Sequence, residues 1–368
     1  MLSPIPELAT PQQRQHVQRL LDRKTKPLGA LGRLEALALQ LALILQTDKP
    51  VLSQPQLVVC AADHGLTAQG VSAYPSEVTG QMVDNFLAGG AAVSVLARQH
   101  GLALTVADCG VNRHFLHNAA DPADQRTELK VRLNVSFKVC KVPGAEAGTA
   151  DASLGPAMTP TQCAAAVSQG QQMLRQLPGN VVLLGEMGIG NTSSAALLLS
   201  KLGGLDIERC TGSGTGLDAQ GLAHKLQVLQ GVLERHAQAH TPMDVLAAMG
   251  GFEIATLVGL TLEAAAQRRV VVVDGFITSA AVLVAHALQP RVLDYCVFSH
   301  LSQERGHALM LQTLHVQALL QLDLRLGEGS GAALAWPLLQ SACSILSDMA
   351  SFDAAGVSEK LPNHDASH

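Results

Sequence analysis

Two glycine-flanked segments carry residue types that could bind and act on a phosphorylated substrate. The first, VVLLGEMGIGNTSS at 181–194, is a short apolar run followed by glycines and then by helix-capping residues. A glycine loop that feeds a helix N-terminus presents backbone N–H groups and the positive end of the helix dipole, which favour an anion. The same pattern suits an ordinary strand-to-helix turn in which the glycines serve geometry alone. Both interpretations are open, and Glu186 is the one acid of the segment.

The second segment is LRLGEGSG at 324–331, where Glu328 has a glycine on each side. Glycine neighbours allow the backbone to approach a ligand closely. A simpler explanation is that Glu328 and Ser330 only cap the apolar helix that follows, because acids and serines favour a helix N-terminus. Capping, however, requires no glycine on both sides. Glu328 is therefore a candidate for chemistry with a bound substrate.

Other polar groups give weaker signals. The loop GSGTG at 212–216 precedes a helix but lacks the Gly-Lys-Ser/Thr ending of a P-loop, and no GxGxxG follows a strand, so ATP hydrolysis and dinucleotide binding are not expected. Lys225 could reach an anion, although its type and position favour a solvated side chain. His64 and His300 show no metal-ligand spacing, so we expect hydrogen-bonded histidines and no metal site.

Composition narrows the class of protein. Hydrophobic residues make up 48% of the 368 residues and charged residues 15%, which is typical of a folded chain with a large core. The net charge of −5, without a basic cluster, argues against nucleic-acid binding. We expect no membrane span and no signal peptide. The seven scattered cysteines, never spaced as CxxC, predict free thiols in a cytoplasmic protein.

The elements that must position these groups alternate between strand and helix. From about residue 50 to 300, buried strands and helices alternate, which predicts a Rossmann-like, three-layer α/β domain with a mostly parallel sheet. A smaller helical domain is expected from 1–49 plus 301–357, with a frayed tail at 358–368. The expected strands are 56–62, 102–111, 181–184, 269–276 and 291–300. Single helices are expected at 76–99 and 303–322, and a hairpin at 131–142.

Polar residues follow each of the five expected strands. Because the carboxyl ends of parallel strands meet at one edge of a sheet, where α/β proteins bind their ligands, these residues indicate a single site. An aspartate at one such end could merely cap the next helix, but five polar ends together favour a site. The residues are Asp63 with His64, Asp108, Glu186, Asp274, and Ser299 with His300.

Several segments together resemble one family, and they occur in the same order from about residue 20 to 350. The family is nicotinate-nucleotide–dimethylbenzimidazole phosphoribosyltransferase, which acts in cobalamin nucleotide-loop assembly. Leu28 and Ala30 depart from its first motif, where proline and serine are usual, and no motif is recognised at 112–147. The matching segments are KPLGALGRLE, ADHGLTAQGVSAYPSEVT, GEMGIGNTSSAA, GTGLD, GGFEIATLVG, residues 271–283, SHLSQERG and LRLGEGSGAALA.

The resemblance implies transfer of ribose 5-phosphate from nicotinate mononucleotide to 5,6-dimethylbenzimidazole, with Glu328 as the general base. It implies no cofactor and a homodimer. The base used in the cell, and any assistance from Glu186, are not determined by the sequence. The phosphate is expected on Gly188, Ile189, Gly190, Asn191, Thr192, Lys225 and Ser302, and the ribose and base near Glu186, Met187, Tyr74 and Leu326.

Two other functions remain open at the level of the sequence. One is a nucleotide- or base-binding protein without catalysis, which an intact Glu328 segment argues against. The other is a metal-dependent phosphohydrolase that uses Asp63 and His64.

Overall fold

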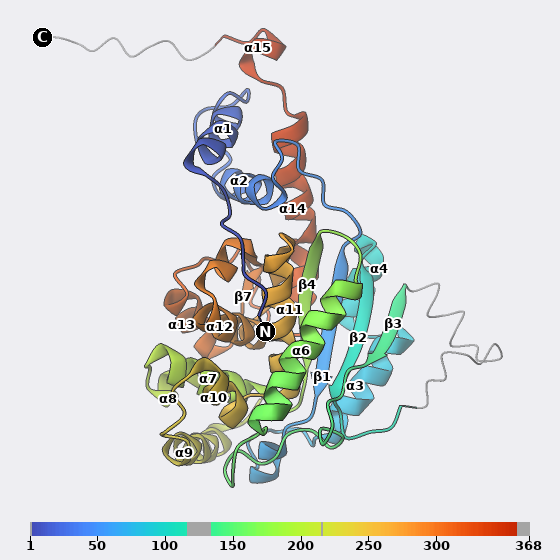
Figure 1. Ribbon diagram of the computed structural model, residues 1–368, viewed down its shortest axis with the longest axis vertical. Helices are drawn as coiled ribbons and strands as arrows, with labels where there is room; N and C mark the ends of the chain where they lie inside the picture. Colours follow the sequence, from blue (N-terminus) through green and yellow to red (C-terminus); the bar gives the residue numbers. More distant parts are fainter. Residues whose placement is uncertain (1, 116–133, 215, 359–368) are drawn as a thin grey trace, which may run out of the picture. The chain divides into compact units, whose positions relative to one another are not determined.

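The computed structural model describes residues 2–115, 134–214 and 216–358 (Figure 1). The chain forms two compact units, Met1–Pro6 with Ser53–Trp336, and Glu7–Leu52 with Pro337–His368. The larger unit includes residues 301–336, which the sequence assigned to the smaller domain. In this stretch, the helix Arg305–Thr313 packs on other helices of the larger unit, and the backbone amides of Gly329 and Ala332 donate to Asp274, directly after a strand of the sheet. The expected tail at 358–368 lies outside the described residues except for its first residue.

A six-stranded parallel sheet forms the centre of the larger unit. Its order, β3-β2-β1-β4-β5-β6, is that of the Rossmann fold and confirms the predicted fold class. The strand order reverses between β1 and β4, where such sheets bind their ligands. The strands are β1 (Gln56–Ala62), β2 (Ala103–Gly110), β3 (Val135–Val139), β4 (Val181–Met187), β5 (Val270–Val273) and β6 (Cys296–Phe298).

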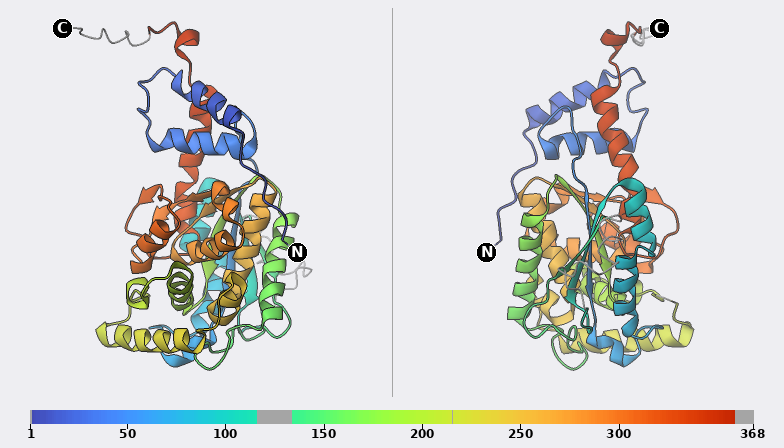
Figure 2. Two further views of the ribbon diagram at one scale, coloured as in Figure 1. Left: turned by 60° about the vertical axis from the view of Figure 1, so that its left-hand side comes forward. Right: turned by 90° about the vertical axis from the view of Figure 1, so that its right-hand side faces the viewer.

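Helices cover both faces of this sheet and make three layers. Figure 2 shows α6 and α11 on one side of the strands and α3 and α4 on the other. Among the described residues, the helices that begin in this unit are α3 (Glu77–Ala88), α4 (Ala92–His100), α6 (Pro160–Gln176), α7 (Asn191–Gly203), α8 (Ile207–Cys210), α9 (Ala219–Arg235), α10 (Pro242–Met249), α11 (Phe252–Ala266), α12 (Phe276–Leu288), α13 (Arg305–Thr313) and α14 (Ser330–Asp348), with 3-10 turns at Gly65–Gln69 and Pro290–Tyr295.

Helix α11 shows how a helix that is mostly apolar on every side suits this core. Fourteen of its fifteen residues are buried, because it packs on the sheet with one side and on α6 with another. Two glycines allow α6 and α11 to touch through their backbones. A Cβ at Gly170 would collide with the Thr256 carbonyl, and one at Gly259 with the Val167 carbonyl. Small residues therefore set the distance between these helices.

Four local predictions are corrected. The helix expected at 76–99 is two helices, because Gly89 ends α3 with φ +77°. The strand expected at 291–300 begins as a 3-10 turn and continues as β6 and then β7 (His300–Leu301). Helix α13 ends at Thr313, and β8 (Leu320–Gln321) pairs in parallel with β7. The described part of the expected hairpin at 131–142 is β3, which pairs in parallel with β2.

The smaller unit is helical, with α1 (Pro11–Asp22), α2 (Arg33–Leu45), α15 (Phe352–Ala355) and the later part of α14. Within it, Lys26 and Glu35 of the first family motif form a buried ion pair at 2.9 Å. All seven cysteines are free and buried, as predicted. Among the described residues, each helix is too short or too polar to cross a membrane.

Candidate active site

A cavity of about 640 Å³ opens within the larger unit. Strand β4 ends in it, at the sheet's reversal point, which is where this fold class binds ligands. Six chain segments that are far apart in the sequence line it. The segments lie within residues 71–82, 186–192, 213–225, 275–277, 300–304 and 323–328.

The strand-end residues contribute unequally. Glu186 and His300 line the cavity, whereas Asp63, His64 and Asp108 do not and instead bond within the protein. Asp274 is fully buried. The expectation that all five strand ends face one site is therefore corrected, because short polar side chains after a strand are also used to hold backbone amides.

The nucleotide loop, as we name residues 188–192, connects β4 to α7 and is shaped by close contacts. A Cβ on Gly188 would lie 2.5 Å from the Ala62 carbonyl oxygen, and one on Gly190 would lie 2.7 Å from Thr67 Cγ2. Gly190 also has φ +92°, which suits glycine. These glycines are required by geometry whether or not an anion binds.

Three amides of this region are already used inside the protein. Ile189 donates to Thr79 Oγ1 at 3.1 Å, Asn191 to the Gly188 carbonyl and Ser193 to the Gly190 carbonyl. An anion at this helix end would therefore depend strongly on nearby side chains as well as on backbone amides. Thr192 and Lys225 line the cavity beside the loop and are placed to supply them.

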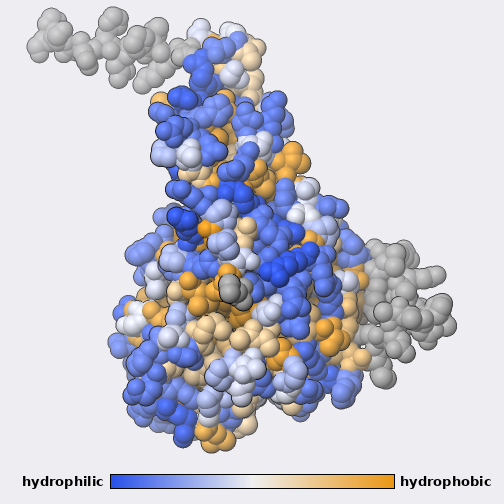
Figure 3. All heavy atoms as spheres, in the orientation of Figure 1, coloured by the Kyte–Doolittle hydropathy of each residue, from blue (hydrophilic) through white to orange (hydrophobic). Residues whose placement is uncertain are grey.

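Lys225 is buried, and the prediction of a solvated side chain is wrong. Only 1% of it is exposed, and its Nζ donates to Thr192 Oγ1 at 3.0 Å. Figure 3 shows hydrophilic residues at the lower left of the molecule, where Figure 1 places α9. On its other side, α9 buries only Lys225, Leu229 and Val232. The spacing of these three residues places the lysine on the inward stripe of α9, a signal that was present in the sequence.

Burial lowers the pKa of Lys225 to about 8, partly offset by the negative charge of Glu304. The second glycine segment lies against this ammonium, since a Cβ on Gly214 would be 3.5 Å from Nζ. Ser213 and Gly214 line the cavity, whereas Thr215 of the same segment is outside the described residues. The sequence placed Lys225 near a phosphate only through the family resemblance, and the geometry now brings it to the nucleotide loop.

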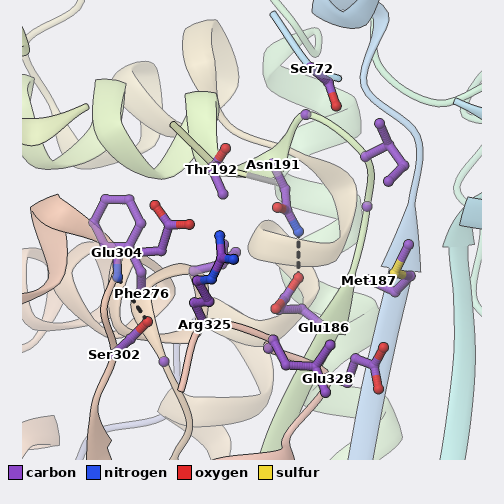
Figure 4. Close-up of a pocket in the computed structure, with 18 of the residues that line it drawn as sticks. Ser72, Glu186, Met187, Asn191, Thr192, Phe276, Ser302, Glu304, Arg325 and Glu328 are labelled. Atoms are coloured by element: carbon purple, nitrogen blue, oxygen red, sulfur yellow. Dashed lines mark hydrogen bonds between the residues drawn. The ribbon is translucent and has the colours of Figure 1, made fainter. Parts of the chain in front are cut away.

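Ser302 lies across the cavity and is held by a histidine. Its backbone N–H donates to His307 Nδ1 at 2.9 Å, and its hydroxyl accepts the Glu304 N–H at 3.2 Å (Figure 4). Burial lowers the pKa of His307 to about 3, with a further contribution from His300, so the ring stays neutral and can accept this bond. Arg325 also lines the cavity. The sequence prediction missed Arg325 and Ser72, although both lie in quoted family motifs.

The Glu328 turn, residues 327–329, has an unusual backbone. Gly327, Glu328 and Gly329 have φ values of +81°, +66° and +89°. A non-glycine residue in this region costs about 1–3 kcal/mol and persists only where its surroundings hold it. The turn packs on the end of β4, because a Cβ on Gly185 would collide with the Glu328 carbonyl and one on Gly327 with the Glu186 carboxyl.

The Glu328 carboxyl group suits proton transfer near neutral pH. Burial raises its pKa to about 7, and the neighbouring Asp274 adds to the shift. Its Oε2 is buried and makes no hydrogen bond among the described residues. A general base works best when its pKa is near the working pH. The Glu328 carboxyl group has such a pKa and an oxygen atom without a hydrogen bond among the described residues, so it is suited to this role.

Glu186 lies beside Glu328 but differs from it in its hydrogen bonds. It accepts hydrogen bonds from the side-chain amide of Asn191 (Figure 4) and from the backbone of Glu328. Burial raises its pKa to about 8, and Asp274 and Glu253 contribute to this rise, so the carboxyl group is mostly protonated at neutral pH. Two carboxyl groups whose pKa values are raised by burial therefore meet at one edge of the cavity.

The rest of the lining is mainly apolar and suits a flat aromatic ring. Tyr74 and Leu326 line the cavity while remaining 51% and 56% exposed, and Met187 lies at the end of β4. Each of the twelve residues that the family resemblance named for binding or catalysis lines this cavity. Their individual roles remain predictions, because no ligand contact tests them.

His64 and Asp63 belong to a separate buried network. His64 Nε2 is 2.6 Å from Glu253 Oε1, and its Nδ1 is 3.1 Å from Ser194 Oγ. Burial lowers the pKa of His64, but the Glu253 carboxylate outweighs it and the pKa rises. Since both ring nitrogens are used, the phosphohydrolase interpretation lacks its metal ligand. Within the described ranges, no group of three histidine, cysteine or acidic side chains could hold a metal ion.

Comparisons with known proteins agree over nearly the whole chain. A family model described as phosphoribosyltransferase matches residues 6–357. Nicotinate-nucleotide–dimethylbenzimidazole phosphoribosyltransferase of Variovorax paradoxus is 64% identical over 344 residues, covering 94% of this chain and 93% of that relative. The enzyme of this name from Cupriavidus taiwanensis is 54% identical, covering 94% and 95%. The crystal structure of the Thermus thermophilus enzyme matches with a TM-score of 0.85 and 38% identity, covering 96% of this chain and 100% of that one.

Proposed function

The chain belongs to the nicotinate-nucleotide–dimethylbenzimidazole phosphoribosyltransferase family, and from this premise we propose how its residues perform the transfer. The ribose 5-phosphate of nicotinate mononucleotide passes to 5,6-dimethylbenzimidazole, which gives α-ribazole 5′-phosphate and nicotinate. The reaction serves cobalamin nucleotide-loop biosynthesis. The observation that supports it most directly is the buried Glu328 carboxyl, with a free oxygen and a pKa raised to about 7, facing a cavity that also contains the nucleotide loop.

The bond changes balance without a metal or an acid. The lone pair of the unprotonated benzimidazole nitrogen attacks the anomeric carbon. The bond from that carbon to the nicotinate nitrogen breaks, and its electron pair neutralises the pyridinium. Glu328 takes the proton from the other benzimidazole nitrogen, which avoids a cationic product. A single displacement on the opposite face converts a β-riboside to an α-riboside.

The phosphate is proposed to lie on the nucleotide loop, Gly188, Ile189, Gly190, Asn191 and Thr192, with Lys225 and Ser302 beside it. The ammonium of Lys225 bonds Thr192 in the same structure, which supports this assignment. We add Arg325, a second cation in the cavity lining. Glu186 and Met187 are proposed for the ribose side, and Tyr74 and Leu326 for the incoming base.

The decisive assay measures nicotinate release by the purified chain with nicotinate mononucleotide and a panel of bases, including dimethylbenzimidazole, adenine and phenols. Release that depends on the base supports the transferase. Binding of the mononucleotide without release of nicotinate would favour the non-catalytic binding protein. The base with the highest kcat/KM identifies the preferred lower ligand.

Assembly and location are also proposals. A homodimer is inferred from the family, and sedimentation of the purified chain tests it. Cytoplasmic location is supported by seven free, buried thiols, which suit a reducing compartment. Fractionation of cells that express the chain tests this second proposal.

A further inference from the structure

Asp274, directly after β5, is fully buried yet does not line the cavity. Its Oδ2 accepts the Gly329 N–H at 3.0 Å, and its Oδ1 accepts the Ala332 N–H at 3.0 Å. The backbone amides of Gly331 and Gly275 also bond this carboxyl group. One side chain thus receives several amides, and most of them follow Glu328 directly in the chain.

These amides are the ones that determine where Glu328 lies. Gly329 is the last residue of the Glu328 turn, and Ala332 lies in the first turn of α14. The first amides of a helix have no partner within the helix, so a carboxylate from elsewhere can cap it. Here the cap comes from a residue 55 positions earlier than Gly329. The strained turn and the helix behind it are therefore fastened to the sheet at one point.

Close contacts leave little space for another position of the Glu328 turn and the start of α14. A Cβ on Gly331 would collide with the His300 ring, whose Nδ1 is 3.7 Å from Asp274 Oδ1. Gly329 approaches the Gly185 Cα in the same way, since its Cβ would lie 3.2 Å away. The turn and the first residues of α14 lie between β4, β7 and Asp274, so displacement of this carboxyl group would move the turn.

The charge of Asp274 also reaches the reacting groups. It raises the pKa of both Glu328 and Glu186. Burial raises its own pKa to about 7, opposed by the amides that it accepts. The ionisable groups that interact with this cluster from the surrounding elements are Glu186 on β4, Glu253 on α11 and His300 on β7, while Glu304 and Arg325 line the same cavity.

We propose that Asp274 is a positioning residue for the transfer, which holds the Glu328 carboxyl group in its reactive place by binding the amides of Gly329 and Ala332. It does not touch the substrate. This inference rests on the proposed function, because it assigns a reason for the placement of the proposed base.

The test compares Asp274→Asn with the wild-type chain in the nicotinate-release assay. Asparagine keeps the shape but turns an NH₂ group towards an amide that needs an acceptor. We expect kcat to fall about 10²-fold, as for a catalytic group displaced by about 1 Å, while the KM for nicotinate mononucleotide stays within about threefold. Loss of the neighbouring charge lowers the pKa of Glu328, so the acid limb of the kcat profile moves to lower pH.

Two further variants separate position from charge and from folding. Asp274→Glu keeps the charge but moves it, so kcat falls while the acid limb stays in place. Asp108→Asn is the matched control, because Asp108 is a buried strand-end carboxyl that accepts the Gly110 and Val111 amides away from the cavity. It should keep the wild-type kcat and profile.

Amide hydrogen exchange on the wild-type chain gives an independent measurement. Slow exchange of Gly329 and Ala332 is expected, and fast exchange of both would overturn the proposal. An unchanged kcat and profile in Asp274→Asn would also overturn it, as would an equal loss in Asp108→Asn. A wild-type chain that releases no nicotinate contradicts the proposed function instead, so the two failures are distinguishable.

Discussion

The nucleotide loop and the Glu328 turn are two glycine-rich turns that line the same cavity but are held in different ways. The nucleotide loop connects β4 directly to α7, so consecutive residues supply its strand, its glycines and its helix end. The Glu328 turn is held by Gly185 and Asp274, which are far away in the sequence. Consecutive residues therefore build the nucleotide loop, and distant residues such as Thr79 and Lys225 complete it. The strained backbone around Glu328 depends on distant contacts for its shape as well.

The strongest test of this difference is Glu328→Gln. The amide has nearly the shape of the acid but cannot accept the proton, so kcat should fall by about 10²- to 10⁴-fold. Binding of nicotinate mononucleotide, measured by calorimetry, should persist because the nucleotide loop is intact. Glu208→Gln, on the exposed surface of α8, is the control. Wild-type turnover in Glu328→Gln would show that another group is the base.

Strand β4, which leads into the nucleotide loop, contacts the Glu328 turn at Gly185, and Gly185→Ala disrupts this contact. The added Cβ collides with the Glu328 carbonyl, so the turn must shift. We expect kcat to fall about 10²-fold with little change in the nucleotide KM, and a loss of about 1–3 kcal/mol in unfolding free energy. Gly155→Ala is the matched control, since a Cβ there meets no atom within 4 Å. A loss confined to the nucleotide KM would contradict this separation.

Lys225→Met tests the nucleotide side and should show the opposite kinetic pattern. Charge-assisted hydrogen bonds contribute about 1.5–3 kcal/mol, so the KM for nicotinate mononucleotide should rise about 10- to 100-fold with a smaller change in kcat. Lys201→Met, on the neighbouring helix α7, is the control. An unchanged KM in Lys225→Met would move the phosphate away from this lysine.

The two regions should also limit activity at opposite ends of the pH range. Glu328 is active when deprotonated, so kcat/KM should fall below its pKa of about 7. Lys225 binds phosphate when protonated, so kcat/KM should fall above its pKa of about 8. The second ionisation of a phosphate, near pH 6, lies below this window. In Lys225→Met the alkaline limb should disappear while the acid limb remains. A profile that stays flat from pH 5 to 9 would contradict both assignments.

Much of the fold could be predicted because it depends on periodic patterns. Near-continuous apolar runs predicted the central strands, and the alternation with helices predicted a parallel sheet. Strand β3 was expected as part of a hairpin and not as a strand of the parallel sheet, because only one of its five residues is buried and it lacks the apolar run of a central strand. The break between α3 and α4 was missed because a glycine pair within a helix is not a certain stop.

The site residues could likewise be predicted only where a pattern of nearby residues indicated them. The nucleotide loop and Glu328 were visible as glycine-flanked motifs, and Lys225 could have been recognised as buried from its spacing with Leu229 and Val232. The orientation of Asp63, His64 and Asp108 could not be read from a strand end, because a short side chain there can face a ligand, a neighbouring helix or an amide.

By itself, the sequence determined the order of strands and helices, the two glycine-flanked motifs and the family. These are properties of residues that are close together in the sequence, so they can be recognised without the tertiary structure. Only the tertiary structure decided that Glu186 and Glu328 meet, that Asp274 binds the amides after Glu328, and that burial shifts their pKa values towards neutrality. Burial and the contact of distant residues exist only once the sheet has brought its carboxyl ends together.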